Sequence, residues 1–220
     1  MEASVALADG DELRVECVLD TASRRNARLL VPAVHESLLK FDWQPADIDV
    51  VSVSIGPGSF TGLRVGVVFA KTFAWINNAK LVAVDTLQGL AQRIAPADSD
   101  ITVISDAQRG DVFVNSYYHL TQQEAVQPRN TVRIENLETF VNTIPAGNLL
   151  TGPAVLKFRD QLSPSFAIAT DDMLEPRASA LLPATRESIA RSNWSDHDSL
   201  EPVYLRRSYA EEKHDAETGT

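Results

Sequence analysis

The feature that most constrains this chain is an apolar segment that enters a glycine-rich turn and leaves it directly as a helical pattern. The turn, Gly56–Ser59, lies between the apolar residues 50–55 and the helical residues 61–75. Glycine adopts backbone angles closed to other residues, proline stiffens a turn, and a serine or threonine hydroxyl caps the first amides of a helix. The order of these three segments predicts a strand, a tight turn and a helix whose first amides point at the turn.

Two interpretations of this turn stay open at the level of sequence. Its amides and the helix dipole would suit an anion such as phosphate, whereas a plain connection would need the glycines only for the change of direction. It is not a Walker loop, because no Lys-Ser or Lys-Thr pair closes it and the first basic residue is Arg64. The residues of the candidate vestigial phosphate pocket are Gly56, Pro57, Gly58, Ser59, Thr61 and Gly62.

The segment around this turn resembles the bacterial TsaB family, the partner subunit in making threonylcarbamoyladenosine beside the tRNA anticodon. The resemblance is most specific in Ser54–Gly66, continues in Ala70–Ala74 and Val82–Leu87, and is weaker in Asp106–Phe113 and Glu201–Arg206. Members resemble two linked halves of the actin and sugar-kinase (RNase H-like) superfold and are related to the catalytic subunit TsaD. The resemblance implies a two-lobed α/β fold and a non-catalytic partner of a TsaD-like enzyme, possessing no cofactor of its own.

Hydrophobic periodicity agrees with an α/β fold in two parts. A polar, proline-containing stretch at 95–100 predicts the boundary between an N-terminal lobe, 1–97, and a smaller C-terminal lobe, 98–220. We expect the acidic end of the second lobe, 211–220, to be disordered. The expected strands are 3–8, 13–19, 50–55, 81–84, 101–105, 111–118 and 131–134, and the expected helices are 28–39, 61–75, 86–93, 137–142, 154–161 and 178–192.

The helix after the glycine turn has more apolar surface than one sheet requires. Its apolar residues follow two faces and leave Arg64 and Lys71 on a narrow polar strip. Either the helix is enclosed by its own lobe, or its second face meets another subunit. In the TsaB resemblance the first two helices pack against TsaD or against a second copy, which favours the interface. The expected interface residues are Ala33, Leu63, Val65, Val67, Phe69, Ala70 and Phe73.

The charge and composition limit the partners of this chain. Its formal net charge is -10 over 220 residues, so we expect contact with tRNA only through another subunit, because RNA is bound largely by Lys and Arg. The single cysteine, Cys17, excludes an internal disulfide framework. No apolar run reaches membrane-spanning length, and the first residues lack an export pattern. We therefore expect a cytoplasmic protein working beside a TsaD-like subunit, with the ATPase subunit of the same complex as a further partner.

Other chemistries find no support in the sequence. His35-Glu36 begins like a zinc-protease helix, but Leu39 stands where the second histidine should be, so we expect no metal site. The spacing in Gly58–Gly62 is not that of a serine-hydrolase elbow, and we expect no catalytic residue. The rival interpretations are an active actin-fold ATPase or kinase that uses the glycine turn for phosphate, and a simple homodimeric interaction protein.

The amino end departs from the family pattern. TsaB-like chains begin with an extra apolar strand and an acidic turn, and here the hairpin at 3–19 starts at once. That strand would lie centrally in the sheet, so its loss would leave backbone groups unpaired. We expect the strand to be encoded upstream, the alternative being a rearranged sheet. Asp20-Thr21-Ala22-Ser23 imitates the actin-like nucleotide turn, but a helix follows it, so we interpret it as a helix cap.

Overall fold

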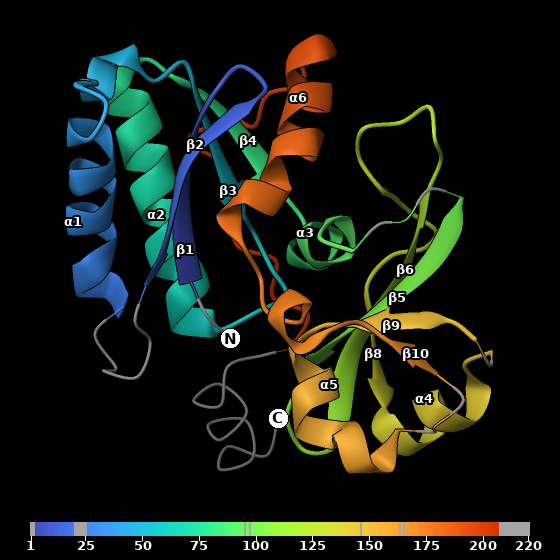
Figure 1. The fold of residues 1–220 in the computed structure, drawn as a ribbon. Coiled ribbons are helices and arrows are strands. Elements are labelled where there is room, and N and C mark those ends of the chain that lie inside the picture. Colours follow the sequence, from blue (N-terminus) through green and yellow to red (C-terminus); the bar gives the residue numbers. More distant parts are fainter. Residues whose placement is uncertain are drawn as a thin grey trace, which may run out of the picture.

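The computed structural model describes residues 3–19, 26–94, 96, 98–145, 147–162, 164 and 166–206. The polypeptide forms two lobes (Figure 1). The Asp20–Ser23 turn and the end at 211–220 lie outside the described residues. The elements of the first lobe are, in chain order, β1 (Ala3–Asp9), β2 (Glu12–Leu19), α1 (Asn26–Leu39), the 3-10 helix η1 (Pro45–Asp47), β3 (Val50–Ser54), α2 (Phe60–Asn77) and β4 (Lys80–Val84).

The second lobe is built on one mixed sheet. Its strands follow the order β10-β9-β5-β6-β7, with β8 also paired to β6. The expected strands 101–105 and 111–118 are confirmed as the antiparallel pair β5–β6. The elements are α3 (Thr86–Gln92), β5 (Ser99–Asp106), β6 (Asp111–His119), β7 (Gln127–Pro128), β8 (Arg133–Asn136), α4 (Leu137–Thr143), β9 (Leu149–Thr151), α5 (Pro153–Phe158), η2 (Arg159–Gln161), β10 (Ala167–Ile168) and η3 (Asp171–Met173).

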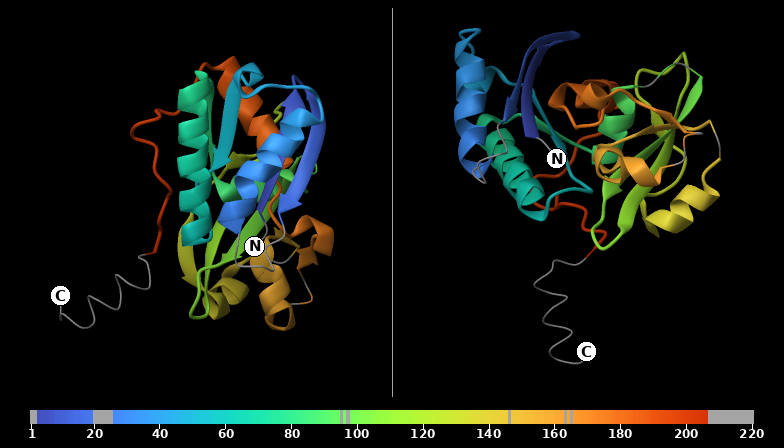
Figure 2. Two further views of the ribbon diagram at one scale, coloured as in Figure 1. Left: turned by 90° about the vertical axis from the view of Figure 1, so that its left-hand side faces the viewer. Right: turned by 60° about the horizontal axis from the view of Figure 1, so that its bottom comes forward.

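The chain then returns to the first lobe. It does so through η4 (Ala178–Leu181) and α6 (Leu182–Ala190), and Leu181 shares a buried cluster with Val82 and Val84 of β4. The extended residues after α6, 195–206, run along α2, and we call them the C-terminal strap (Figure 2). This return differs from the expected assignment of all of 98–220 to one lobe, because a polar linker marks where a lobe begins and not where the chain later crosses back.

The strands of the first lobe form two separate sheets. β1 and β2 pair antiparallel, and β3 and β4 pair parallel, with no described strand joining the two pairs. The predicted hairpin is thus confirmed, and Gly10 occupies its turn with a φ of 56°. Helix α1 packs on β1 and β2, α2 packs on β3 and β4, and the two helices lie side by side (Figure 1).

One side of α2 faces the lobe's own sheet. Leu63, Val67, Ala70 and Ala74 are buried at helical spacing, and Ala70 and Ala74 cluster with Leu81 of β4. The helix begins at Ser59, whose hydroxyl accepts a hydrogen bond from the Gly62 amide at 3.4 Å, as its capping role predicts. Burial of these four residues holds α2 against the sheet. The glycine turn at the beginning of α2 is thereby held in place.

Candidate functional site

The glycine turn is held between the start of α3 and the C-terminal strap. The Gly56 amide donates to the Thr86 hydroxyl at 3.1 Å, and the Thr86 amide donates to the Gly56 carbonyl at 2.9 Å. On the other side the Val203 amide donates to the Ile55 carbonyl at 2.8 Å. The turn is therefore a junction at which β3, α3 and the strap meet.

Gly56 must be a glycine at this junction. Its φ is +122°, and a Cβ added there would lie 2.8 Å from the Val203 carbonyl oxygen. The amides of Gly56 and Gly62 already bond to Thr86 and Ser59. Two donors of the candidate phosphate pocket are thus engaged within the chain. Pro57 is buried, Gly58 is half-buried, and Ser59, Thr61 and Gly62 are exposed.

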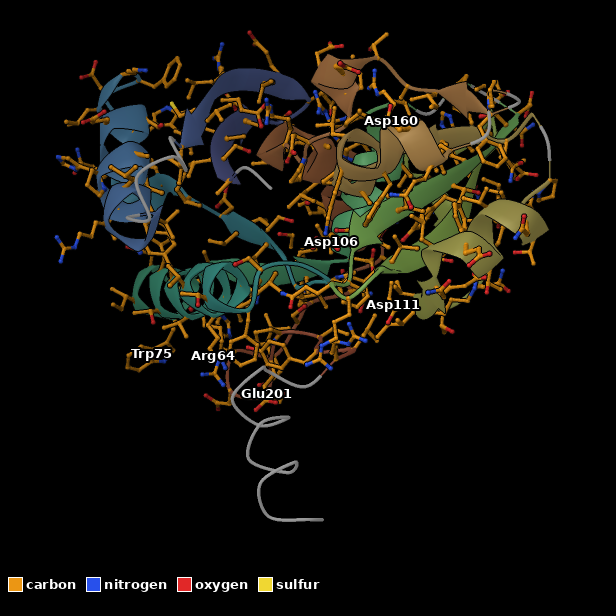
Figure 3. The ribbon with its side chains drawn as sticks, turned by 90° about the horizontal axis from the view of Figure 1, so that it is seen from below. Arg64, Trp75, Asp106, Asp111, Asp160 and Glu201 are labelled. Carbon is orange, nitrogen blue, oxygen red and sulfur yellow. The ribbon has the colours of Figure 1, made fainter. Side chains whose placement is uncertain are left out.

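The polar strip of α2 holds the strap. Lys71 donates from Nζ to the carbonyls of Asp198 at 3.1 Å and Leu200 at 2.9 Å. Arg64 lies 4.3 Å above the Phe60 ring and donates from Nε to the Tyr204 hydroxyl at 3.1 Å. Arg64 and Glu201 lie on the same side of the molecule (Figure 3). The two cations of the narrow polar strip therefore bind a segment that lies far away in the sequence.

The end of the strap reaches the second lobe. Arg206 donates from Nη2 to a carboxylate oxygen of Asp111 at 2.8 Å, and its Nη1 donates to the carbonyls of Ala107 and Gln108. The ion pair is about three-quarters buried on both sides, so it is screened less than a surface pair. The strap thus connects α2 of one lobe to the β5–β6 turn of the other. No local sequence pattern around Arg206 predicts this contact.

A buried acid lies where β4 meets α3. The Asp85 carboxylate caps α3 by accepting from the Gln88 amide at 2.9 Å, and it accepts from the Tyr117 hydroxyl of β6 at 2.9 Å. Burial raises the pKa of Asp85, although the hydrogen bonds from Gln88 and Tyr117 act in the opposite direction. Burial and the neighbouring Asp85 raise the pKa of Tyr117 as well. This pair joins the end of β4 to β6 of the second lobe.

Asp85→Asn is expected to change the pH dependence of stability. A carboxyl whose pKa is raised on folding binds its proton more tightly in the native state, so its contribution to stability falls as the pH rises through its unfolded and then its folded pKa. The asparagine side chain keeps an oxygen that can accept the hydrogen bonds from Tyr117 and Gln88, but it has no carboxyl group to titrate. The unfolding free energy of the variant relative to the wild type, measured in urea titrations, should therefore rise as the pH increases from about 4, the ordinary pKa of an aspartate. A difference that does not change with pH would contradict the buried-acid description.

Both helices of the pair carry exposed apolar side chains. On α2, Val68, Trp75 and Ile76 are 62%, 74% and 67% exposed, and on α1, Val31 and Leu39 are 58% and 57% exposed. We call these five residues the outer face. Trp75 points away from the body of the molecule, on the side of the strap (Figure 3). Single exposed apolar residues are ordinary. An exposed tryptophan on a helix that carries other exposed apolar side chains indicates a binding surface.

The interface residues expected from the sequence separate into two groups. Leu63, Val67 and Ala70 are buried against the lobe's own sheet, so they support α2 from beneath and cannot themselves touch a partner. The remaining four, Ala33, Val65, Phe69 and Phe73, are half-buried. Phe69 and Phe73 stack with ring centroids 5.6 Å apart. Sequence periodicity identified the two apolar faces of this helix. Val68, Trp75 and Ile76, which are not among the expected interface residues, are exposed.

Two further properties concern only the part of the chain that is described. Among those residues, no group of three or more His, Cys, Asp and Glu side chains is arranged to hold a metal ion. Nor does any helix within them combine the length and hydropathy needed to cross a membrane.

The lobes, the glycine turn and the strap place this molecule in the class of actin-like two-lobed α/β proteins. A crystal structure described as an uncharacterized protein with similarity to peptidase YEAZ from Pseudomonas aeruginosa superposes with a TM-score of 0.79 at 23% identity, covering 93% of this chain and 94% of that one. A family model described as TsaD, tRNA N6-adenosine threonylcarbamoyltransferase, matches residues 19–140.

Full-length relatives define the family within that class. The tRNA threonylcarbamoyladenosine biosynthesis protein TsaB of Bacillus subtilis (strain 168) is 32% identical over 214 residues, which are 95% of this chain and 91% of the relative. The protein with the same name from Escherichia coli (strain K12) is 25% identical over 209 residues, 90% of this chain and 88% of the relative. The chain belongs to the TsaB family. The resemblance and the fold class expected from the sequence are thereby confirmed.

Proposed function

We propose that this protein is the TsaB-type partner of a TsaD-like enzyme in the formation of threonylcarbamoyladenosine in tRNA. Full-length similarity to proteins named for that biosynthesis, together with the match to the TsaD model, supports the role. The structural observation that carries the docking mode is the outer face, where Trp75 is 74% exposed. The partner binds there, across α1 and α2, and the half-buried Phe69 and Phe73 stiffen α2 from the side.

The protein supports the enzyme and carries out no chemistry of its own in this proposal. Gly56 of the glycine turn is bonded to Thr86, and the carbonyl of the preceding residue, Ile55, accepts from the Val203 amide, which suits a structural junction. The formal net charge of -10 leaves the tRNA contact to other subunits. Direct contact with an ATPase subunit of the complex and a cytoplasmic location belong to the same proposal.

The comparisons with known proteins give no support to the alternative of an active ATPase or kinase. An activity measurement separates the two roles. The purified chain alone, mixed with ATP and magnesium, should release no phosphate above the background of the buffer. Addition of a TsaD-like subunit should give a complex in light scattering with the summed mass of the two chains. Turnover of ATP by the chain alone would overturn the accessory role, and a self-dimer that ignores the TsaD-like subunit would favour the homodimeric interaction protein.

A further inference from the structure

The described chain passes between the two lobes at two places that lie side by side. It leaves the first lobe at Asp85, between β4 and α3, and it returns at residues 174–177, between η3 and η4. Arg93, directly after α3, donates hydrogen bonds to the carbonyls of Asp172 and Glu175, and α3 packs against η4. Two neighbouring crossings act as a hinge, so rotation about them is the least restricted motion between the lobes.

Two side-chain contacts between the lobes lie near one end of β6. The Tyr117 hydroxyl donates to Asp85 at 2.9 Å, and Gln127 of β7, beside the same end of β6, donates to the Glu187 carboxylate of α6 at 3.2 Å. Asp111 lies at the opposite end of β6, about 20 Å from Tyr117 at the rise of a β-strand. The β5–β6 turn is therefore distant from both contacts, and the strap attaches it to the first lobe.

Arg206 holds the β5–β6 turn in an uncommon backbone conformation. Gln108 and Arg109 have φ values of 66° and 55°, in the left-handed region that residues other than glycine adopt at a cost in free energy. The guanidinium of Arg206 donates to the carbonyls of Ala107 and Gln108 and to the carboxylate of Asp111. These charge-assisted hydrogen bonds offset part of that cost. Arg206 therefore supports the turn and attaches it to the first lobe at the same time.

The two ends of the strap are held in different ways. At its start, the Ser195 amide donates to the Leu81 carbonyl at 2.8 Å, and the Ala83 amide donates to the Ser195 hydroxyl at 3.0 Å, so the strap is bonded to β4. Leu200 packs against the buried cluster of α2 and β4. In contrast, residues 201–206 are all exposed or half-buried and form no helix or strand. The strap is thus anchored at its start and held by surface contacts at its end.

We propose that the strap is a latch between the lobes, closed by Arg206 on the β5–β6 turn. With the latch closed, the second lobe is held at the two crossings and at the turn, so the angle between the lobes is fixed. The Arg206–Asp111 ion pair is about three-quarters buried, and separating it would leave two partly desolvated charges, so the closed latch is the resting state. When Arg206 leaves the turn, the end of the strap moves away from its anchor at Ser195 and the lobes rotate. This inference rests on the contacts of the strap and is independent of the proposed function.

Distances between two spin labels on the full chain test the latch. Val31→Cys on α1 and Leu156→Cys on α5 place one label on each lobe at exposed positions, in a chain whose single cysteine is replaced by Cys17→Ser. We expect one narrow distance distribution in this parent chain. Arg206→Met keeps the length of the side chain but removes its donors, and it should broaden the distribution at least about twofold, because the lobes then sample several angles. Asp111→Ala should broaden it in the same way.

Lys157→Met provides the matched control at the same turn. Lys157 pairs with Asp106 at 2.6 Å within the second lobe, so its loss removes an ion pair of the turn without touching the strap, and the distribution should stay narrow. A second label pair, Val31→Cys with Ile189→Cys on α6, reports on the first lobe alone and should be unchanged in every variant. An unchanged distribution between the lobes in Arg206→Met would overturn the proposal, as would equal broadening in Lys157→Met. Broadening within the first lobe would also decide against it, because Arg206 would then support the fold and not the angle between the lobes.

Discussion

Trp75→Asp is expected to weaken binding to a TsaD-like subunit by at least about 30-fold, which corresponds to about 2 kcal/mol. The side chain is 74% exposed on α2, so the free protein loses little when it is replaced, whereas a carboxylate in an apolar interface would be desolvated without a partner. Isothermal titration of the TsaD-like subunit with wild type and variant measures the change. The melting temperature of the variant should stay within about 2 °C of the wild type.

Leu156→Asp provides the matched control for this prediction. Leu156 lies on α5 of the second lobe and is 44% exposed, so the same change of apolar to acidic surface occurs away from the outer face. Its affinity for the partner should equal that of the wild type. Equal affinities for Trp75→Asp and Leu156→Asp would exclude the outer face as the docking surface, even if the complex still forms.

Gly56→Ala is expected to reduce the free energy of unfolding by about 3 kcal/mol. Two effects add at this residue: its φ is +122°, and the new Cβ would meet the Val203 carbonyl oxygen at 2.8 Å. The backbone must shift, so the hydrogen bond from the Val203 amide to the Ile55 carbonyl should break and release the strap. Urea unfolding measures the stability, and limited proteolysis after residue 195 measures the release.

Gly110→Ala separates the two effects. Gly110 also has a positive φ, +84°, but an added Cβ would meet no atom within 4 Å. Only the conformational strain remains, and the expected loss is about 1 kcal/mol without any change in the proteolysis of the strap. If the two variants lost equal stability, the contact between the glycine turn and the strap would not be holding the junction together.

Much of the fold could be predicted because its signals are local. The Asp9-Gly10 turn between alternating strands is a short-range signal, and the hairpin forms there. The strand, turn and helix around Gly56 were equally predictable, because glycine, proline and a capping serine act within a few residues. The strands β7, β9 and β10 were missed, since segments of two or three residues carry no measurable alternation.

The candidate site was less predictable because its decisive contacts join residues that are far apart in the sequence. Arg64 bonds to Tyr204 and Lys71 to the carbonyls near Leu200, and no pattern within a sequence window contains these pairs. The same limit applies to α2. Periodicity shows that Leu63 and Val68 lie on different sides of the helix, but the packed sheet decides that Leu63 is buried and Val68 exposed.

The central claim is tested most directly by reconstituting threonylcarbamoyl transfer to tRNA with and without this protein. The reaction would contain the TsaD-like enzyme, the remaining subunits, the threonylcarbamoyl donor and tRNA, and modified adenosine would be quantified by mass spectrometry. We expect modification to depend on this chain, to fall at least about 10-fold with Trp75→Asp at limiting concentration, and to be normal with Leu156→Asp. Full modification in the absence of the chain, or no modification after its addition to an otherwise competent mixture, would contradict the account.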